Sequence, residues 1–381
     1  MLTFLRSLSK GILLLVNGII AILFIACCLA PRMHPQDWWF TGFLGLFFPF
    51  LFISLVLFLL LWLMLKPKLA LFPLAVLVLG MIPFSVHFSL RFNDRFDLVK
   101  NEKSIRLMNW NIRHFIPFNE KRFKPHSNDQ HQLIYNEIKR LDPDILCMQE
   151  FLSMPGEGSS DPLHVIKKEL GYTYHEFAGE NIFGSKQSSG IAIFSKYPII
   201  HSGLVQFPPS EEGNAENTVF ADLKVDDDTI RLYSIHLQSF GFGAREYHAI
   251  DDIENDTNDG ESMHLLRKMR NTFFWHGVQS DFIRKDIDES PYPVLMAGDM
   301  NDVPNSYAYA RLKGSMNDAF LEKGGGLGAT FTSATSSMLR LLPTLRIDYI
   351  FSDDHFETLQ FDQGGNRISD HAFLVSDVKL R

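Results

Sequence analysis

The sequence predicts an α/β fold, a four-layer sandwich of two packed mixed sheets flanked by helices, preceded by three transmembrane helices. Two observations carry this prediction. Long apolar runs fill most of the first 100 of 381 residues, and the remainder alternates short apolar strands with turns and a few helical segments. Many strands with few helices between them favour two packed sheets over one singly wound parallel sheet. We therefore divide the chain into a membrane anchor, residues 1–100, and a second domain, residues 104–381.

The anchor is predicted from three runs without Asp, Glu, Lys or Arg, at about residues 11–30, 40–65 and 69–90. Each is long enough to cross ~30 Å of hydrocarbon as a helix. A cleaved signal peptide is the competing interpretation of the first run, but that run is longer than the usual ~7–15 residues and two more follow. A buried core helix could mimic one span, whereas three runs in succession, with Trp38 and Trp39 at one edge, favour a membrane bundle.

The basic residues around these runs predict the orientation. Arg6 and Lys10 precede the first run, and Lys66 and Lys68 lie between the second and the third. Cytoplasmic loops carry an excess of Lys and Arg, so both segments are expected on the cytoplasmic side. Basic residues in the segment 91–103 act against this assignment, although acidic residues are interleaved with them. We expect an integral protein of the inner or cell membrane whose second domain is extracytoplasmic or periplasmic.

Cysteine usage and charge limit the classes of protein. Cys27 and Cys28 lie inside the first apolar run and Cys147 in an apolar strand, so no disulfide framework is expected. The net charge is −8, with an acidic cluster at 226–228. Such a chain offers no basic surface that follows a phosphate backbone, which disfavours nucleic acid as the partner.

The second domain is expected to begin after a short polar linker, residues 91–103. Short apolar segments bounded by turn residues predict the strands, and a few longer segments between them predict the helices. The expected strands are 105–109, 145–149, 190–194, 219–225, 230–235, 294–297, 347–351 and 372–378, and the expected helices are 128–141, 162–170, 264–287 and 306–312. The polar segment 241–262 and the glycine-rich segment 324–328 are expected to be surface loops.

Five short polar clusters stand at or just beyond the ends of these strands. They are Asn109–Asn111, Gln149–Glu150, His236, Gly298–Asn301, and the pair formed by Arg346–Asp348 and Ser369–His371. A buried scaffold can hold side chains rigidly at such a common edge. Each cluster alone is weak evidence, because a lone Asp after a strand is usually a turn or helix cap.

Together and in this order, the five clusters resemble the endonuclease/exonuclease/phosphatase family, which includes deoxyribonuclease I, exonuclease III, inositol polyphosphate 5-phosphatases and neutral sphingomyelinases. The segment 189–199, Ser-Gly-Ile-Ala-Ile-Phe-Ser-Lys-Tyr-Pro-Ile, matches a further part of the family pattern. The resemblance covers residues 105–380. His236 favours the deoxyribonuclease I-like, sphingomyelinase-like branch over the apurinic-endonuclease branch, which usually has no histidine at that place.

The resemblance implies a divalent metal, Mg²⁺ or Mn²⁺, held by Asn111, Glu150 and Asp370. These hard cations prefer oxygen ligands and retain waters, and an amide and carboxylates supply such ligands.

The resemblance also implies the catalytic residues. Asp299 would position or deprotonate the attacking water, and Asn301 would donate to the phosphoryl oxygens. Residues two apart leaving a strand can point to the same side, so one phosphorus centre is within reach of both. Asp348 would orient His371, which would contact the scissile phosphate or transfer a proton, and His236 would be a second phosphate contact. The weaker candidates His114, Lys186, Gln238, His264 and His276 fit surface or core roles better.

The implied reaction is in-line attack of water, activated by the metal and Asp299, on a phosphoester. The predicted anchor, the acidic domain and the apolar segment Met338–Pro343 before Asp348 favour a lipid or lipid-linked phosphate, cleaved as by a sphingomyelinase-like phospholipase C or a lipid diphosphate phosphatase. The leucines of that segment could equally pack on the domain itself. The alternatives are a tethered extracytoplasmic nuclease and an inactive membrane scaffold. The expected partners are the lipid bilayer and the phosphoester, and nothing indicates a protein partner.

Overall fold

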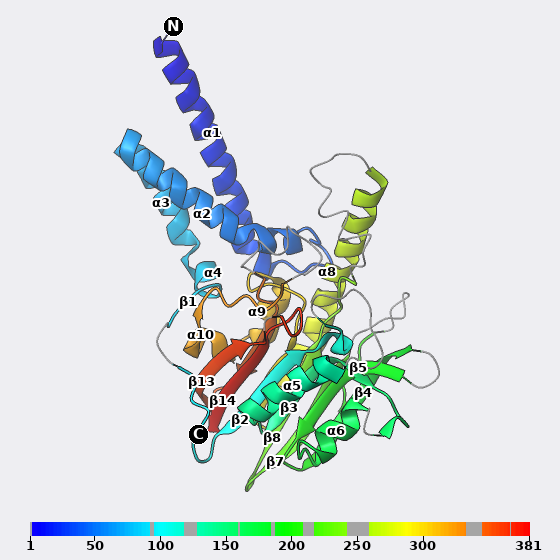
Figure 1. Cartoon of the computed structure of the whole chain (residues 1–381). Coiled ribbons are helices and arrows are strands. Elements are labelled where there is room, and N and C mark those ends of the chain that lie inside the picture. Colours follow the sequence, from blue (N-terminus) through cyan, green and yellow to red (C-terminus); the bar gives the residue numbers. More distant parts are fainter. Residues whose placement is uncertain are drawn as a thin grey trace.

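The computed structural model describes residues 2–91, 95–117, 128–158, 161–183, 187–208, 217–241, 259–332, 345–365 and 367–381. Two six-stranded sheets form the centre of the second domain (Figure 1). One sheet has the strand order β13 (Phe356–Gly364), β14 (Phe373–Leu380), β2 (Ile105–Asn111), β3 (Ile145–Ser153), β5 (Gln187–Ser195) and β4 (Tyr174–Phe183). The other has the order β10 (Asn317–Asp318), β12 (Asp348–Ser352), β9 (Val294–Asp299), β8 (Asp228–His236), β7 (Thr218–Val225) and β6 (Ile199–Leu204).

Three apolar clusters build the layers of this domain. Between the sheets, Leu107 of β2 and Leu295 of β9 belong to one buried cluster. The outer face of the first sheet packs on α5 (Asn128–Leu141) and α6 (Pro162–Lys168). The outer face of the second sheet packs on α8 (Asp259–Asp288) and α9 (Tyr307–Lys313). The central strands are buried on both faces, as all seven positions of β2 show, and the predicted α/β architecture of two mixed sheets flanked by helices is confirmed.

All eight predicted strands and all four predicted helices are present, with shifted ends. The strands that the sequence did not predict are β4, β6 and β13, which lie at sheet edges, and the short segments β1 (Ser89–Leu90), β10 and β11 (Gly325–Gly326). Edge strands bury fewer side chains, and β6 has exposed or half-buried positions throughout. An apolar pattern is therefore weak in these segments. The short helix α10 (Ala319–Lys323) was also not predicted.

Two long apolar helices precede the sandwich, α1 (Leu2–Leu29) and α2 (Thr41–Leu65), joined by the 3₁₀ helix η1 (Ala30–Arg32). Within the described residues, these two are long and apolar enough to cross a membrane. Only 22% and 17% of their apolar windows are buried, which is unlike the core helix of a soluble domain. Their exposed faces carry large apolar side chains such as Leu15, Ile22 and Leu57.

The third predicted span is not a continuous helix. Residues 67–85 form α3 (Pro67–Leu79), of 13 residues, and the short α4 (Met81–Ser85), with Gly80 between them. A side chain at Gly80 would collide with the ring of Phe24, whose atoms lie 2.2 Å from an ideal Cβ position. Pro83 has no amide hydrogen to continue a helical ladder. The prediction of three transmembrane helices is thus corrected to two candidate spans and a broken third segment.

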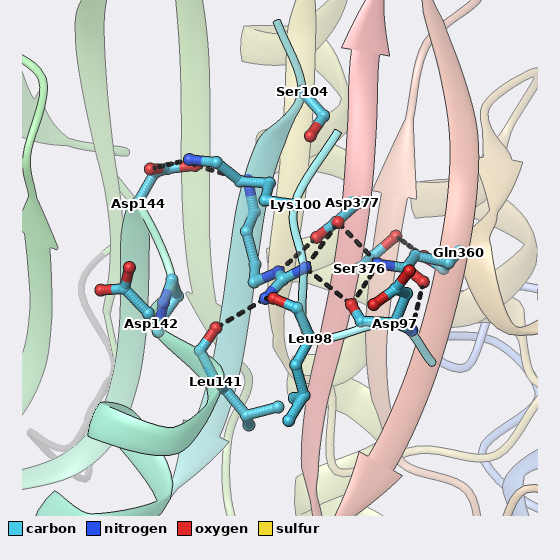
Figure 2. Close-up of polar contacts among 12 residues, drawn as sticks. Asp97, Leu98, Lys100, Ser104, Leu141, Asp142, Asp144, Gln360, Ser376 and Asp377 are labelled. Atoms are coloured by element: carbon cyan, nitrogen blue, oxygen red, sulfur yellow. Dashed lines mark hydrogen bonds and ion pairs between the residues drawn. The ribbon is translucent and has the colours of Figure 1, made fainter. Parts of the chain in front are cut away.

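The predicted linker is tied to the sandwich at the edge opposite the strand ends described below (Figure 2). Arg106 forms a paired ion contact with Asp377, with Nε–Oδ1 and Nη2–Oδ2 distances of 2.6 and 2.9 Å. It also donates to the carbonyl oxygens of Asp97 and Leu98 at 3.0 Å. Lys100 binds Asp144 at 2.5 Å. The chain from Asp97 to Lys100 therefore follows the sandwich surface and is not a free tether.

Candidate active site

Polar residues gather where the parallel strands of both sheets end. Asn111 is the last residue of β2 and pairs with Gln149 of β3, and Glu150 is the next residue after Gln149. His236 and Asp299 end the parallel strands β8 and β9 and are opposite each other in register. Because carboxyl ends of parallel neighbours meet at one edge, and the two sheets are packed together, these four residues share one end of the sandwich.

Two further residues reach this edge from antiparallel strands. Asp348 is the first residue of β12 and pairs with Asp299. His371 lies two residues before β14, which runs antiparallel to β2. One ligand atom of each of Asp299, Asp348 and His371 lies within 4.8 Å of the others, and all three residues are buried.

Asn111 connects the two sheets. Its Nδ2 donates to Glu150 Oε1 at 3.2 Å and to Asp299 Oδ2 at 3.0 Å. Its Oδ1 accepts the backbone N–H of Arg113 at 3.0 Å. One amide group therefore holds a carboxylate from each sheet, which fixes the distance between them.

His371 is oriented by a buried carboxylate. The distance from its Nδ1 to Asp348 Oδ2 is 3.0 Å, and to Asp299 Oδ2 it is 3.6 Å. Burial would lower the pKa of His371, but Asp348 and Asp299 together raise that pKa well above its ordinary value. Trp110 Nε1 donates to the His371 carbonyl at 2.9 Å, which fixes the backbone as well. The imidazole is thus held as a cation with Nε2 as the second N–H donor.

Asp299 has a pKa raised toward neutrality. Burial and the neighbouring Asp348 raise its pKa to about 6, although His371 and His236 act in the opposite direction. The backbone N–H of Asn301 donates to its Oδ1 at 2.8 Å. A carboxylate with a pKa near neutrality is a competent general base at physiological pH.

Asn301 lies beside Asp299 in a left-handed conformation, with φ of 50°. Its Nδ2 donates to the Leu237 carbonyl at 3.0 Å. An amide nitrogen has two hydrogens, so one remains for another acceptor. The geometry agrees with the expected donor role, which stays a prediction.

Arg113 and His114 complete the group. Arg113 Nε lies 3.2 Å from Asp370 Oδ2, and His114 Nδ1 lies 3.0 Å from Glu150 Oε2. Burial raises the pKa of Asp370 despite the nearby His371 and Arg113. Burial also acts to raise the pKa of Glu150, but His114, His236 and His371 hold it far below its ordinary value. The sequence did not single out Arg113, and it placed His114 among the weak candidates.

Backbone strain marks the same edge. Three successive residues after the β2 cluster, Arg113, His114 and Phe115, have φ between 50° and 59°. Glu150 also has a φ of 50°, at an irregularity in the pairing of β3 with β5. Non-glycine residues rarely adopt this region, and such residues cluster at functional sites. The turn at 113–115 returns the chain toward Glu150 and Asp370, and nothing in the sequence pattern indicates that turn.

His276 has structural partners instead. His276 is buried and bonds Asp302 Oδ2 at 3.1 Å and the Gln238 carbonyl at 2.8 Å, a structural arrangement. His264 lies on an exposed position of α8. Lys186 and the segment Met338–Pro343 fall outside the described residues.

The donor set fits a hard divalent cation. Carboxylate oxygens of Glu150 and Asp299 converge on the amide of Asn111, and Asp370 is close enough to Glu150 for their charges to interact. Burial raises the pKa of Asp299 and of Asp370, because it disfavours their charged forms, and a cation bound nearby would stabilise those charged forms. Oxygen ligands with no thiolate suit Mg²⁺ or Mn²⁺. Asn111, Glu150 and Asp370 are the ligands that the resemblance implies, and this assignment stays a prediction; among the described residues, Asp299, Asp348 and His371 also form a cluster that could hold a metal ion.

Comparison with known families agrees with this geometry. The model of the endonuclease/exonuclease/phosphatase family matches residues 108–371. A second family, described as a domain of unknown function, matches residues 10–87. No match to a curated protein was found.

Several solved structures share the fold. An endonuclease/exonuclease/phosphatase from Beutenbergia cavernae has 20% identity and a TM-score of 0.52, over 73% of this chain and 72% of that one. The human nocturnin catalytic domain with a bound sulfate anion has 18% identity and a TM-score of 0.50, over 74% and 96%. A family protein from Leptotrichia buccalis has 14% identity and a TM-score of 0.51, over 72% and 100%.

The family match covers every residue of the strand-end group, from Asn111 to His371. Members of this family are hydrolases that act on phosphoesters with the help of a divalent metal. The chain therefore belongs to the endonuclease/exonuclease/phosphatase family.

Proposed function

We propose that this protein is a membrane-anchored, divalent-metal-dependent phosphoesterase that hydrolyses a lipid or lipid-linked phosphoester. The observation that carries the hydrolytic part is the buried Asp348–His371 pair beside Asp299, with an Nδ1–Oδ2 distance of 3.0 Å. The lipid part is supported by the two long apolar helices in the N-terminal part of the chain, which pack beside the catalytic domain.

Each residue has a defined role in this proposal. Asp299 accepts a proton from the attacking water, because its pKa of about 6 leaves it ionised yet basic at neutral pH. His371, held cationic by Asp348, donates to the phosphoryl group or protonates the leaving oxygen. Asn301 and His236 contact the remaining phosphoryl oxygens. Asn111, Glu150 and Asp370 hold the cation, which offsets negative charge on the phosphoryl oxygens when bound.

The anchor crosses the bilayer with its far end in the cytoplasm in this proposal. The start of α1 and the turn between α2 and α3, which carries Lys66 and Lys68, lie at the end far from the sandwich (Figure 1). A basic end of this kind favours the cytoplasmic side and leaves the catalytic domain outside. Because the chain returns to the sandwich after Lys66, the broken segment made of α3 and α4, with 13 and 5 helical residues, would lead it back across the bilayer.

A panel of substrates tests the proposal. Full-length protein in detergent and in vesicles is assayed with Mg²⁺ or Mn²⁺, or with EDTA, against sphingomyelin, a phosphoinositide, a polyprenyl diphosphate and plasmid DNA. The proposal expects metal-dependent release of phosphate or a phosphorylated headgroup from a lipid, abolished by Asp299→Ala. Cleavage of DNA without lipid turnover would instead identify the tethered nuclease. Inactivity toward the whole panel would count against the proposal and favour the inactive scaffold.

A further inference from the structure

The apolar helices contact the sandwich next to the catalytic edge. Leu46 of α2 packs in one apolar cluster with Val303, Leu345, Ile347 and Phe331. Ile347 immediately precedes Asp348, and Val303 follows Asn301 by two residues. The anchor therefore touches the segments from which the catalytic side chains project, and not a remote face of the domain.

The first turns of α2 approach the domain closely. An ideal Cβ at Gly42 would lie 2.4 Å from the ring of Phe273 in α8. One at Gly45 would lie 2.8 Å from the Asn305 carbonyl oxygen and 3.3 Å from Val303 Cγ2. No larger side chain fits at either position without displacing backbone or a buried ring. Asn305 Nδ2 also donates to the Cys27 carbonyl at the end of α1, at 2.8 Å. This contact region is called the dock below.

A second contact reaches Arg346, two residues before Asp348. Arg346 Nη2 donates to the Val86 carbonyl, just after α4, at 2.7 Å, while its Nη1 binds Asp318 at 2.7 Å. Ser89 Oγ donates to the Gly324 carbonyl at 2.7 Å. The anchor thus binds both residues that precede Asp348, Arg346 through Val86 and Ile347 through Leu46.

The side chain of Phe331 lies between Leu46 of the anchor and His371. The Phe331 ring belongs to the Leu46 cluster, and its centroid lies 5.0 Å from that of His371. Phe331 and His371 are also paired through their backbones. Leu46 and Phe331 are both only partly buried, so apolar surface remains on them.

The position of Leu46 along α2 indicates how deep the catalytic edge lies relative to the membrane. Leu46 lies five residues after the first residue of α2, which corresponds to roughly 8 Å along the helix. Trp38 and Trp39 directly precede α2, and tryptophan is enriched at the level of the lipid headgroups. The guanidinium of Arg270 in α8 lies 5.7 Å from the Trp39 ring centroid, so α8 reaches the same level.

We infer that the dock seats the catalytic edge at the headgroup level of the bilayer, so that Leu46 and Phe331 face the apolar part of a membrane-resident phosphoester. This inference rests on the proposed function and goes beyond it. The anchor is then a positioning element that selects bilayer-presented substrates, and Gly42 and Gly45 are the residues that permit its close contact. A flexible tether would leave the choice of substrate to the domain alone.

Gly45→Val tests the inference, with Gly18→Val as the matched control. Valine at 45 would press on Asn305 and Val303, whereas nothing lies within 4 Å of a Cβ at Gly18 of α1. Full-length protein is assayed on sphingomyelin and on a polyprenyl diphosphate in phosphatidylcholine vesicles, and on soluble bis(4-nitrophenyl) phosphate. Gly45→Val is expected to lower the ratio of kcat/KM on vesicle lipid to kcat/KM on the soluble diester by about tenfold or more, since small misplacements of a reacting group are costly. Gly18→Val should leave the ratio unchanged.

Other outcomes separate the two ideas. Wild-type turnover of a vesicle lipid together with an unchanged ratio in Gly45→Val would overturn the inference and leave the proposed function intact. Equal losses on both substrates would show that the dock is only structural. A wild type that cleaves the soluble diester but neither lipid would overturn both. If Gly45→Val fails to fold, Leu46→Ala decides, because it removes the apolar contact without a collision and should lower the same ratio.

Discussion

Asn111, Asp299 and His371 each join parts of the molecule that are far apart in sequence. Asn111 holds Glu150 and Asp299 through one amide nitrogen, and His371 lies between Asp348 and Asp299. Each carboxylate is thereby fixed by a neighbour before substrate arrives. Such preorganisation costs little reorganisation at the moment of reaction.

Asp348→Asn tests the Asp348–His371 pair. The substitution keeps the shape but removes the charge that holds His371 cationic, so kcat should fall about 10²-fold or more, the size typical of one lost electrostatic contact. KM should change little if Asp348 does not touch the substrate. Asp354→Asn, which removes an equal charge from an exposed position six residues away, is the control. Steady-state kinetics on any substrate that the wild type cleaves measures kcat and KM for both variants. A kcat of Asp348→Asn within fivefold of wild type would refute the role of Asp348 in holding His371.

The pH profile tests Asp299. Its folded-state pKa is raised to about 6, so the carboxylate is protonated below that pH and cannot accept a proton from water. His371 remains protonated through neutral pH because its pKa is also raised. We expect log kcat/KM to rise with pH and to level off, with a midpoint at or somewhat below pH 6. The midpoint can lie below 6 because a nearby cation lowers the pKa of a carboxylate. Activity that increases as pH falls from 7 to 5 would exclude Asp299 as the base.

At the scale of secondary structure, the sequence predicted the elements that carry the site because the central strands are continuous apolar runs. It missed β6 and β13, whose faces are partly exposed, and the left-handed turn at 113–115. It overestimated the third span because an uncharged run gives length but not continuity, and the helix is interrupted at Gly80, where the Phe24 ring leaves no room for a side chain. The sequence also could not predict the dock, because its tertiary contacts leave no periodic pattern in the sequence.

The clamp between Arg106 and the linker is the element-scale feature most open to a stability test. Arg106 and Asp377 are each 1% exposed, so Arg106→Met would leave a buried carboxylate without its partner. Removing one partner of a buried pair typically costs about 3–5 kcal/mol. Thermal unfolding of the full chain in detergent should show a large drop in Tm.

Arg140→Met is the control for this test. Arg140 pairs with Glu137 on the exposed face of α5, and surface pairs contribute only about 0–1 kcal/mol. If Arg106→Met lowers Tm no more than Arg140→Met does, the contacts of Arg106 do not stabilise the domain.

At the scale of the whole molecule, two units make contact beside the catalytic edge. The sandwich supplies a group of buried carboxylates and histidines at its strand ends, and the anchor binds the residues beside them. The resemblance in the sequence predicted the first unit, and residues 108–371 match the family. The arrangement of the two units followed only from the contacts of Leu46, Asn305 and Arg346, which no linear pattern reveals.

The central claim is that this group of residues binds a divalent metal and uses it to hydrolyse phosphoesters. The most direct measurement is isothermal titration of metal-free full-length protein with Mn²⁺, paired with Mn²⁺-dependent hydrolysis of bis(4-nitrophenyl) phosphate, for wild type and Glu150→Gln. We expect wild type to bind Mn²⁺ and its activity to rise with site occupancy and disappear in EDTA, and we expect Glu150→Gln to weaken both binding and activity. Hydrolysis that persists in EDTA, or equal Mn²⁺ binding by wild type and Glu150→Gln, would contradict the central claim.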